Sequence, residues 1–386
     1  MEVVKIVVEI IGFMYNAEFW RMSVFWTVSL IFSYLKLFYQ SLFSPISICY
    51  THCSPKDSTF ATKLVPRPVC IITGATSGLG AAAAYALSKE GFYVVLVGRS
   101  SELLSKAISD IKSRNHDACL KAFEVNLSSF TSILEFKHSL QQWLRDSNMH
   151  SSVQLLINNA GILATSRRFT SEGYDQMLAT NYVGAFCLTK VLLPLLENSP
   201  IPSRVVNVTS FTHRNVSCRQ ADKETVSGKF FLKSKDYPYA CIYEYSKLCI
   251  LLFSYELHRK VGLMKKSQHL SVVAADPGAV QTNIMREIPS SVSTMAFTAM
   301  KLLGVLQSSE TGVGAIIDAA LAPPEVSGVY FFGGKGRSLN SSALSYDAKL
   351  AKDLWDASCT LFEELQQASR ADGVRAVHKY GTVVSD

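Results

Sequence analysis

The chain has 386 residues, of which 48% are apolar and 18% charged, so a large buried core is possible and extensive disorder is excluded. The net charge of +7 is spread without a basic run, which excludes nucleic acid as an expected partner, whereas an anionic membrane surface or simple solvation both fit it. The nine cysteines stand without a C-x-x-C pair, so we expect no disulfide framework and no metal site, and a reducing compartment suits them.

Apolar sequence is concentrated near the N-terminus. Residues 22–35 carry no charge, and the apolar character resumes beyond Lys36 up to Phe43. If Lys36 reaches the lipid headgroups, this stretch has roughly the 20 residues of a membrane helix, and we predict an anchor helix over about residues 20–43. A secretory signal peptide is the competing interpretation, but acidic residues precede the run and no cleavage site is evident. An in-plane amphipathic helix or a hairpin also stays open.

The residues on either side of the apolar run indicate its orientation and where the next domain begins. Basic residues are more frequent after the apolar run than before it, which weakly favours a cytosolic position for the rest of the chain. The endoplasmic reticulum is the membrane we expect. A polar, proline-containing stretch then reads as a linker. We therefore predict an anchor over residues 1–49, a linker over 50–68, one domain over 69–365 and a C-terminal tail over 366–386.

Beyond the linker, short apolar runs alternate with helix-like stretches. The strand-like runs are residues 69–73, 92–97, 118–125, 153–158, 204–208 and 270–275. The helix-like stretches between the first three runs end near residue 89 and cover 101–114, and another lies near 129–145. Continuous apolar strands between helices predict a parallel sheet covered on both faces. The expected fold class is α/β, a single doubly wound Rossmann-type domain.

A glycine-rich turn joins the first predicted strand to the first helix. It reads TGATSGLG over residues 73–80, with glycines at Gly74, Gly78 and Gly80. Glycines allow a tight turn and a close approach of phosphate, and the helix N-terminus attracts the anion. The signal is weak alone, because such glycines are often structural and the spacing is not G-x-G-x-x-G.

The second predicted strand ends at Gly98 and Arg99, where an acidic residue would bind the ribose 2′-hydroxyl of NAD. A guanidinium can instead pair with the 2′-phosphate of NADP. A solvated arginine at a strand end is the alternative. The sequence therefore favours NADP(H) over NAD(H).

Tyr243 and Lys247 lie four residues apart in a stretch with helical spacing, so their side chains are expected on one face. A nearby ammonium lowers a tyrosine pKa from about 10 toward neutrality, and the phenol can then act as a general acid or base. A surface tyrosine packed along a lysine stem is the alternative interpretation.

Other polar motifs follow predicted strands or open helices, at the edge where an open α/β sheet binds its ligand. They are Asn158-Asn159-Ala160-Gly161, Asn181, Thr209-Ser210 and the segment 276–282, DPGAVQT. In this order, together with the glycine turn and the Tyr-x-x-x-Lys pair, they resemble the motifs of the short-chain dehydrogenase/reductase family. The resemblance covers roughly residues 67–365 and is nearest to the membrane-associated retinol-dehydrogenase-like and polyprenol-dehydrogenase-like group.

The resemblance implies a catalytic group of Asn181, Ser210, Tyr243 and Lys247. Ser210 would hydrogen-bond the substrate oxygen, and Tyr243 would exchange the proton. Lys247 would lower the pKa of Tyr243 and bind the nicotinamide ribose, and Asn181 would hold a water that relays protons to Lys247. The implied cofactor contacts are Gly74, Ser77, Gly78, Leu79, Gly80, Arg99, Asn126, Leu127, Asn158, Ala160, Gly161, Tyr243, Lys247, Pro277, Gly278, Val280 and Thr282.

The sequence departs from the family pattern at three places. Asn126 stands where an Asp near the adenine is usual, and Asp276 replaces the His or Asn often found before Pro-Gly. Between Ser210 and Tyr243 lies a polar, lysine-rich stretch, residues 211–238, which we expect to form a surface excursion beside the mouth of the site.

An apolar, helix-like run over residues 289–307 follows the Pro-Gly segment, where the family covers its substrate. With the anchor, it favours a lipophilic alcohol or ketone such as a retinoid, steroid or polyisoprenoid, although an ordinary packed helix explains it equally well. We therefore expect an NADP(H)-dependent oxidoreductase acting on CH–OH groups. The alternative is a catalytically silent cofactor-binding scaffold or redox sensor. The expected partners are the lipophilic substrate, the membrane and a second copy in a homodimer.

Overall fold

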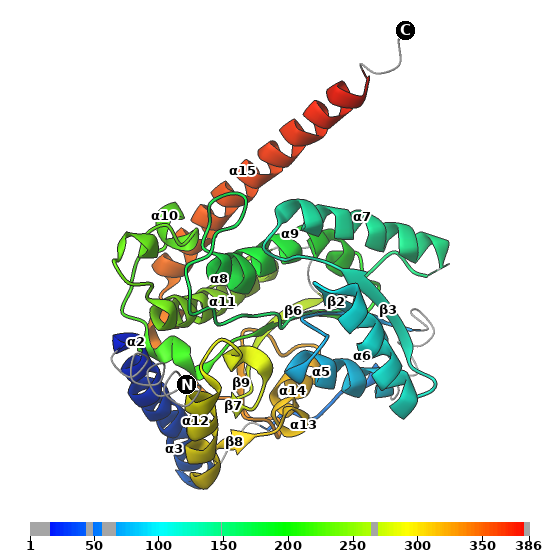
Figure 1. Ribbon diagram of the computed structural model, residues 1–386. Helices are drawn as coiled ribbons and strands as arrows, with labels where there is room; N and C mark the ends of the chain where they lie inside the picture. Colours follow the sequence, from blue (N-terminus) through cyan, green and yellow to red (C-terminus); the bar gives the residue numbers. More distant parts are fainter. Residues whose placement is uncertain (1–15, 44–48, 56–66, 148, 264–268, 382–386) are drawn as a thin grey trace, which may run out of the picture.

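The structure is a computed structural model that describes residues 16–43, 49–55, 67–147, 149–263 and 269–381, with side chains as far as residue 370 (Figure 1).

Seven parallel strands form the central sheet, in the order β3-β2-β1-β4-β5-β6-β9. The strands are β1 (Val69–Thr73), β2 (Tyr93–Gly98), β3 (Cys119–Glu124), β4 (Leu155–Asn158), β5 (Ser203–Val208), β6 (Leu270–Asp276) and β9 (Tyr330–Phe332). The order reverses direction between β1 and β4, so the sheet is doubly wound and its ligand crevice is expected at that point. The predicted fold class is confirmed, while β9 was not predicted as a strand.

Both faces of the sheet are covered by helices, as predicted from the continuous apolar strands. Within β1, Val69 and Ile71 join the core on one face, and Cys70 and Ile72 join the core on the other. The first face is covered by α7 (Phe130–Asp146), α9 (Gly184–Glu197) and α11 (Tyr239–Leu263). The second is covered by α5 (Gly78–Lys89), α6 (Ser101–Arg114) and α14 (Gly314–Leu321).

Short elements connect these layers. The helical ones are α8 (Gln176–Leu178), the π-helix η3 (Ala179–Val183), η4 (Phe211–Asn215), α10 (Lys223–Val226), η5 (Phe231–Lys233), η7 (Asn283–Met285), α12 (Ser290–Leu302), α13 (Ser309–Gly312) and η8 (Ala343–Tyr346). Strands β7 (Ala279–Val280) and β8 (Leu306–Gln307) form a separate parallel pair. The predicted apolar run over 289–307 therefore contains α12 and β8.

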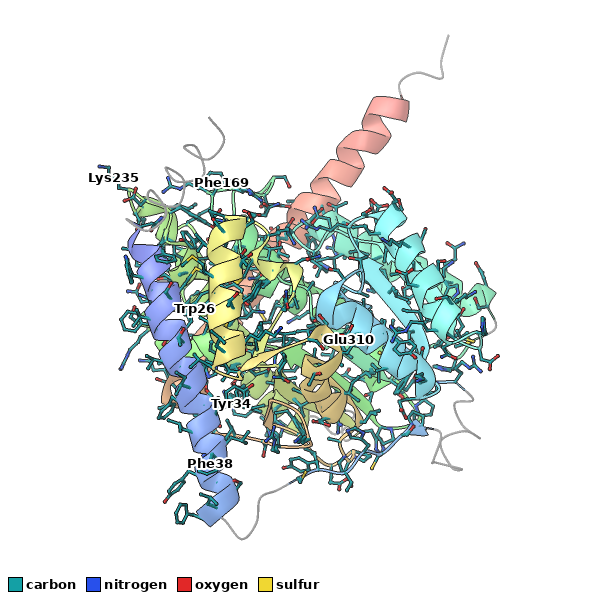
Figure 2. The ribbon with its side chains drawn as sticks, turned by 60° about the horizontal axis from the view of Figure 1, so that its bottom comes forward. Trp26, Tyr34, Phe38, Phe169, Lys235 and Glu310 are labelled. Atoms are coloured by element: carbon teal, nitrogen blue, oxygen red, sulfur yellow. The ribbon has the colours of Figure 1, made fainter. Side chains whose placement is uncertain are left out.

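The N-terminal apolar segment forms one continuous helix over Ala17–Phe43, made of α2 (Ala17–Trp20), the π-helical turns η1 (Arg21–Trp26) and α3 (Thr27–Phe43). By length and composition this helix can cross a membrane. Its inner face packs against the domain, where Leu30 and Leu37 join a small core with Tyr330 and Phe332. Its outer face is apolar and exposed, and Figure 2 shows Phe38 pointing away from the domain. A second helical stretch of similar apolarity, Gln176–Glu197, is mostly buried in the core.

The predicted domain limits fall on packed segments. Tyr50 donates its backbone N–H to Gly336, and His52 pairs with Asp318 at 2.8 Å, so the described part of the predicted linker packs against α14 and the loop after β9. The predicted boundary at residue 365 falls inside α15 (Ala348–Gly381), which projects from the domain in Figure 1.

The segment 211–238, expected to be a surface excursion, is partly built into the domain. Thr225 and Val226 in α10 are buried, and α10 packs against α15. The phenol of Tyr245 in α11 donates a hydrogen bond to the carbonyl of Gln220 at 2.7 Å. This segment therefore supports the outer side of the helix that carries Tyr243.

Candidate active site

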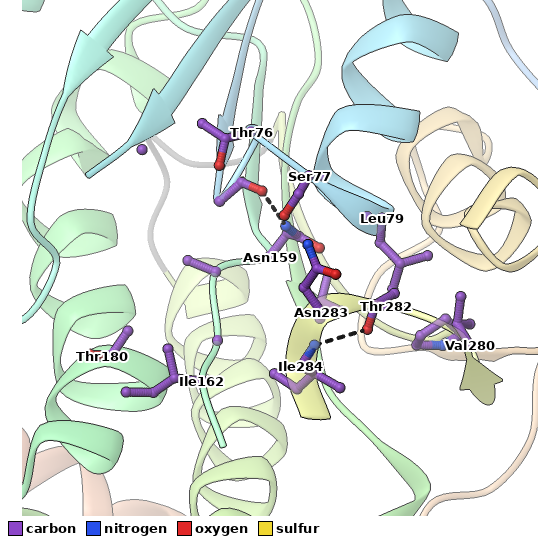
Figure 3. A pocket seen from close by; sticks show the side chains of 18 of the residues that line it. Thr76, Ser77, Leu79, Asn159, Ile162, Thr180, Val280, Thr282, Asn283 and Ile284 are labelled. Atoms are coloured by element: carbon purple, nitrogen blue, oxygen red, sulfur yellow. Dashed lines mark hydrogen bonds between the residues drawn. The ribbon is translucent and has the colours of Figure 1, made fainter. Parts of the chain in front are cut away.

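A groove runs along the carboxyl edge of the sheet, where the ends of six strands meet. Residues after each of β1 to β6 line it, from Gly74 after β1 to Gly278 after β6. Figure 3 shows side chains of the glycine turn, Asn159 and the segment after the Pro-Gly turn gathered around this groove. Ligands of open α/β sheets bind at such an edge.

The glycine turn at the start of the groove requires glycine at two kinds of position. Gly74 and Gly78 have φ of +66° and +52°, the left-handed region that glycine adopts without steric cost. A side-chain carbon at Gly80 would lie 2.2 Å from the carbonyl oxygen of Gly74, so only glycine allows this helix to start so close to β1. Helix α5 begins here, and its first N–H groups lack partners within the helix and suit an anion.

The Asn-Asn-Ala-Gly motif divides between the core and the groove. Asn159 lines the groove and donates its amide to the carbonyl of Thr73 at 2.8 Å. Asn158 is buried in β4 and donates to Thr189 at 2.9 Å and to Asn207 at 2.8 Å. The prediction assigned the contact to Asn158, but alternation along β4 turns that side chain into the core, on the side of α9.

Asn126, the other predicted adenine-side contact, does not line the groove either. Its side-chain oxygen accepts hydrogen bonds from the backbone N–H of Ser128 at 3.2 Å and from its hydroxyl at 2.8 Å. Its neighbours Val125 and Leu127 line the groove instead. Asn126 therefore shapes the turn after β3.

The catalytic tyrosine and lysine predicted from the sequence lie on α11, one turn apart, and both line the groove. The Lys247 ammonium nitrogen lies 5.6 Å from the centre of the Tyr243 ring and donates to the carbonyl of Val208 at 3.3 Å. Thr209 donates its hydroxyl to the carbonyl of Lys247 at 2.8 Å, which ties α11 to the end of β5. Ser210 follows directly and also lines the groove, so the structure brings Ser210, Tyr243 and Lys247 together.

Asn181 lies behind this group, in the π-helical turn η3. Its side chain exchanges hydrogen bonds with the backbone of Ile162, at 2.8 and 2.9 Å, and donates to Ser246 at 3.2 Å. A side-chain carbon at Gly161 would lie 3.5 Å from the Lys247 nitrogen and 3.6 Å from the Asn181 oxygen. Lys247 and Asn181 therefore face the same small space beside Gly161. A π-helical turn at such a position is typical of functional sites.

Burial sets the proton affinities of the group. Burial raises the pKa of Tyr243 above its ordinary value, and the Asp276 carboxylate raises it further, while a hydrogen bond with Ser210 lowers it. Burial lowers the pKa of Lys247 to about 8, against the opposing effect of Asp276. The pKa of Tyr243 therefore moves opposite to the prediction, because burial of the phenolate and the Asp276 charge outweigh the hydrogen bond with Ser210.

Asp276 has a larger part in the site than the sequence suggested. It is fully buried, and its oxygens accept hydrogen bonds from the backbone N–H of Gly278 at 2.8 Å and from Tyr330 at 2.6 Å. These contacts fix the Pro-Gly turn at the groove. Burial raises the pKa of Asp276 to about 6, which those hydrogen bonds and the charge of Lys247 oppose. Asp276 is thus a carboxylate near neutral pH, within electrostatic reach of Tyr243 and Lys247.

Arg99 is exposed at the end of β2 and lines the groove, as predicted. The groove also contains residues that were not predicted, among them Thr180, Asn283 and the exposed Arg286. Thr180 and Asn283 adjoin predicted motifs, whereas Arg286 lies outside every motif and carried no sequence signal. The remaining predicted residues that line the groove are Ser77, Leu79, Ala160, Pro277, Val280 and Thr282.

Known proteins with similar sequences and structures include dehydrogenases. The sequence model for short chain dehydrogenases matches residues 68–221. The chain is 31% identical to human polyprenol dehydrogenase over 305 residues, which is 77% of this chain and 86% of the relative. It is 29% identical to human retinol dehydrogenase 13 over 77% of this chain and 85% of that protein. A crystal structure of an uncharacterised Mycobacterium paratuberculosis protein superposes with a TM-score of 0.57 and 26% identity, over 81% of this chain and 98% of that one.

Proposed function

The chain belongs to the short-chain dehydrogenase/reductase family, in the retinol and polyprenol dehydrogenase group, and from this premise we propose an NADP(H)-dependent oxidoreductase that interconverts a lipophilic alcohol and its aldehyde or ketone. The observation that carries the proposal is the meeting of Ser210, Tyr243 and Lys247 in one groove that begins at the glycine turn. Family members bind NAD(P). The preference for NADP and the residue roles below are our proposals.

The residues that line the groove support the binding of a dinucleotide. The turn at Gly74, Gly78 and Gly80 leaves no side chain between the backbone and a pyrophosphate at the start of α5. Arg99, at the end of β2, is exposed within the groove and has no ion-pair partner among the residues described. It can therefore fork onto the 2′-phosphate of NADP. When bound, the cofactor supplies or accepts the hydride.

The chain itself handles the proton. Ser210 holds the substrate oxygen by a hydrogen bond, and Tyr243 donates a proton to that oxygen in reduction or removes one in oxidation. The raised pKa of Tyr243 keeps the phenol protonated near neutral pH, which favours its role as an acid. Lys247 and Asn181, which face one space beside Gly161, return the proton through a water between them.

An apolar substrate fits the surroundings of the groove. Helix α12 follows the segment that lines it, and only Val292 of its residues is buried. Met295 and Leu302, two helical turns apart, expose 68% and 85% of their surface, so α12 presents apolar side chains outward. The relatives are named for polyprenol and retinol, both lipophilic alcohols. These observations support a retinoid, steroid or polyisoprenoid substrate, with a long apolar chain beside α12.

The N-terminal helix supports a membrane location, which we propose to be the endoplasmic reticulum with the catalytic domain toward the cytosol. Val28, Phe32 and Leu35 are all exposed on its outer face. With the inner face packed on the domain, this outer face suits the lipid interface. Cell fractionation with protease protection tests the location, and a domain sheltered in the lumen would contradict it.

Purified full-length protein in detergent, assayed with NADPH and a panel of apolar aldehydes and ketones, tests the activity. We expect turnover of retinal-like or polyisoprenoid carbonyls and the reverse reaction with NADP. Binding of NADPH without turnover of any carbonyl or alcohol would contradict the proposal and favour a catalytically silent scaffold.

The replacement Asp276→Asn is expected to shift the pH profile of alcohol oxidation toward acid by about one unit. Oxidation needs the Tyr243 phenolate, and the Asp276 carboxylate raises the pKa of both Tyr243 and Lys247. Without this charge both pKa values fall, so the rising limb of kcat against pH moves to lower pH. Since the pKa of Asp276 is about 6, the two enzymes converge in more acidic buffer, where the wild-type carboxyl is neutral.

The matched control is Asp318→Asn, which removes a buried carboxyl outside the groove that pairs with His52. We expect a change in stability with an unchanged pH profile. An unshifted profile for Asp276→Asn would show that its charge does not reach the phenol.

A further inference from the structure

We propose that the inner face of the N-terminal helix forms a wall of the substrate site, and that Trp26 selects substrates with an extended apolar part beside Tyr243. This inference rests on the proposed function and deepens it. The sequence treats Ala17–Phe43 as an anchor that is separable from catalysis, but the structure connects it to the catalytic helix at several points.

The first connection is a direct contact with the proposed proton donor. The rings of Trp26 and Tyr243 lie 5.4 Å apart, centre to centre, with 37° between their planes. Trp26 also donates its indole N–H to Glu244, the residue after Tyr243, at 2.7 Å. The hydrogen bond fixes the orientation of the indole, so a rigid apolar surface stands next to the phenol. Figure 2 shows Trp26 and Tyr34 on the side of the helix that faces α12 and the domain.

The second connection neutralises a buried charge. Glu244 on α11 has no exposed side-chain surface, and the Arg21 guanidinium binds both of its oxygens at 2.6–3.0 Å. In the described part of the chain, the hydrogen bonds that Glu244 accepts come from Arg21 and Trp26. A buried carboxylate is stable only with such partners. The docked helix therefore supplies the partners of the buried Glu244 carboxylate, directly beside Tyr243.

The third connection caps the catalytic helix. Glu18 accepts hydrogen bonds from the backbone N–H of Ala240 at 2.8 Å and of Cys241 at 3.2 Å. These groups lie in the first turn of α11, where N–H groups have no partners within the helix and a negative charge is favourable. The N-terminal helix thereby holds the start of the helix that carries Tyr243 and Lys247.

A fourth contact reaches the other end of the site. The Tyr34 hydroxyl accepts a hydrogen bond from Gln307 at 3.1 Å, and a side-chain carbon at Gly278 would lie 2.9 Å from it. Gln307 also donates to the carbonyl of Pro277 at 3.0 Å. The helix thus runs from Tyr243 to the Pro-Gly turn, and contacts residues at both ends of this side of the groove.

Lipid and substrate meet on this helix. Its outer face exposes Phe25 and Val28, which flank Trp26 within one turn, while Trp26 itself faces the phenol. An alcohol or carbonyl with a long apolar chain can lay that chain on the indole while its oxygen reaches Tyr243 and Ser210. A short substrate reaches the same oxygen position without this contact. The contact with Trp26 should therefore increase the affinity for substrates with a longer apolar chain.

The test measures kcat and KM for a long isoprenoid carbonyl and a short aliphatic one in detergent, with saturating NADPH. For Trp26→Ala we expect the ratio of the KM for the long substrate to the KM for the short one to rise about tenfold, because the lost indole–Glu244 bond affects both substrates alike and only the long one loses the apolar contact. Trp26→Phe, which keeps an aromatic surface, should restore most of the affinity. The control Phe32→Ala, on the outer face, should leave both KM values unchanged.

If Trp26→Ala had the same KM values as the wild type, the proposed substrate wall would be wrong. The same holds if the KM rose equally for the long and the short substrate. Absence of wild-type turnover would instead refute the proposed function, so the two failures differ. If Trp26→Ala does not fold, photolabelling of the wild-type protein tests whether the apolar chain of the substrate lies beside Trp26. An isoprenoid alcohol with a diazirine on its chain should label the peptide that contains Trp26, and unlabelled alcohol should compete. Labelling that is confined to other peptides would overturn the proposal.

Discussion

Replacing Tyr243 with Phe is expected to lower kcat for both reduction and oxidation about a thousandfold. The substitution removes only the phenolic oxygen, so the ring still packs against Trp26 and the groove keeps its shape. Ser210 can still bind the substrate oxygen, but the proposed proton donor to that oxygen is then missing. Affinity for NADPH should stay within a few-fold, because the substitution leaves the proposed cofactor contacts of the glycine turn and Arg99 in place. Stopped-flow turnover and fluorescence titration of NADPH measure the two effects.

Tyr245→Phe is the matched control, because it removes a phenol from the same helix two residues further on. That phenol bonds the carbonyl of Gln220, outside the groove. We expect a stability loss of about 1 kcal/mol with activity retained. Near-normal turnover of Tyr243→Phe would mean that the proton comes from another group, and the proposed chemistry would fail.

Much of this site could be predicted because its signals are local. The glycine turn needs three small residues at fixed spacing, and Gly80 is required by a backbone contact only six residues away, at Gly74. Tyr243 and Lys247 share a helix face by spacing alone. The strands were visible as apolar runs because both faces of the sheet are covered.

The errors and omissions have a different cause. Asn158 and Asn159 are adjacent, and only the direction of each side chain in β4 decides which one enters the groove. The role of Asp276 could not be predicted from the sequence, because its carboxylate is held by Tyr330, which comes from the strand at the edge of the sheet. Arg286 belongs to no motif. These features depend on tertiary packing, which a local pattern does not encode.

The docking of the N-terminal helix is the clearest case. Arg21 and Glu244 are 223 positions apart; Arg21 belongs to no motif, and Glu244 occupies a variable position between Tyr243 and Lys247. An apolar run near a terminus is the usual sign of an anchor, and the sequence gives no reason to expect its inner face beside the catalytic helix. Under the two proposals above, one face of this helix contacts lipid and the opposite face contacts the active site, so residues three or four positions apart on the same face serve the same role.

Replacing Arg99 with Ala is expected to raise the Kd for NADPH roughly 30-fold while leaving the Kd for NADH nearly unchanged. The guanidinium lies exposed at the end of β2 in the groove, where the adenosine ribose of a dinucleotide binds. A charge-assisted hydrogen bond to a phosphate is worth about 2 kcal/mol, and NADH has no 2′-phosphate to lose it. Fluorescence titration with each cofactor measures the two constants.

The selectivity of the loss, more than its size, identifies the contact. Arg145→Ala removes an exposed arginine on α7 outside the groove and should leave both constants unchanged, which controls for the altered net charge. Raising the salt concentration should weaken NADPH binding more in the wild type than in Arg99→Ala, because the screened ion pair exists only in the wild type. An equal weakening of NADPH and NADH would assign Arg99 to the pyrophosphate or to the fold, and the NADP preference would then need another source.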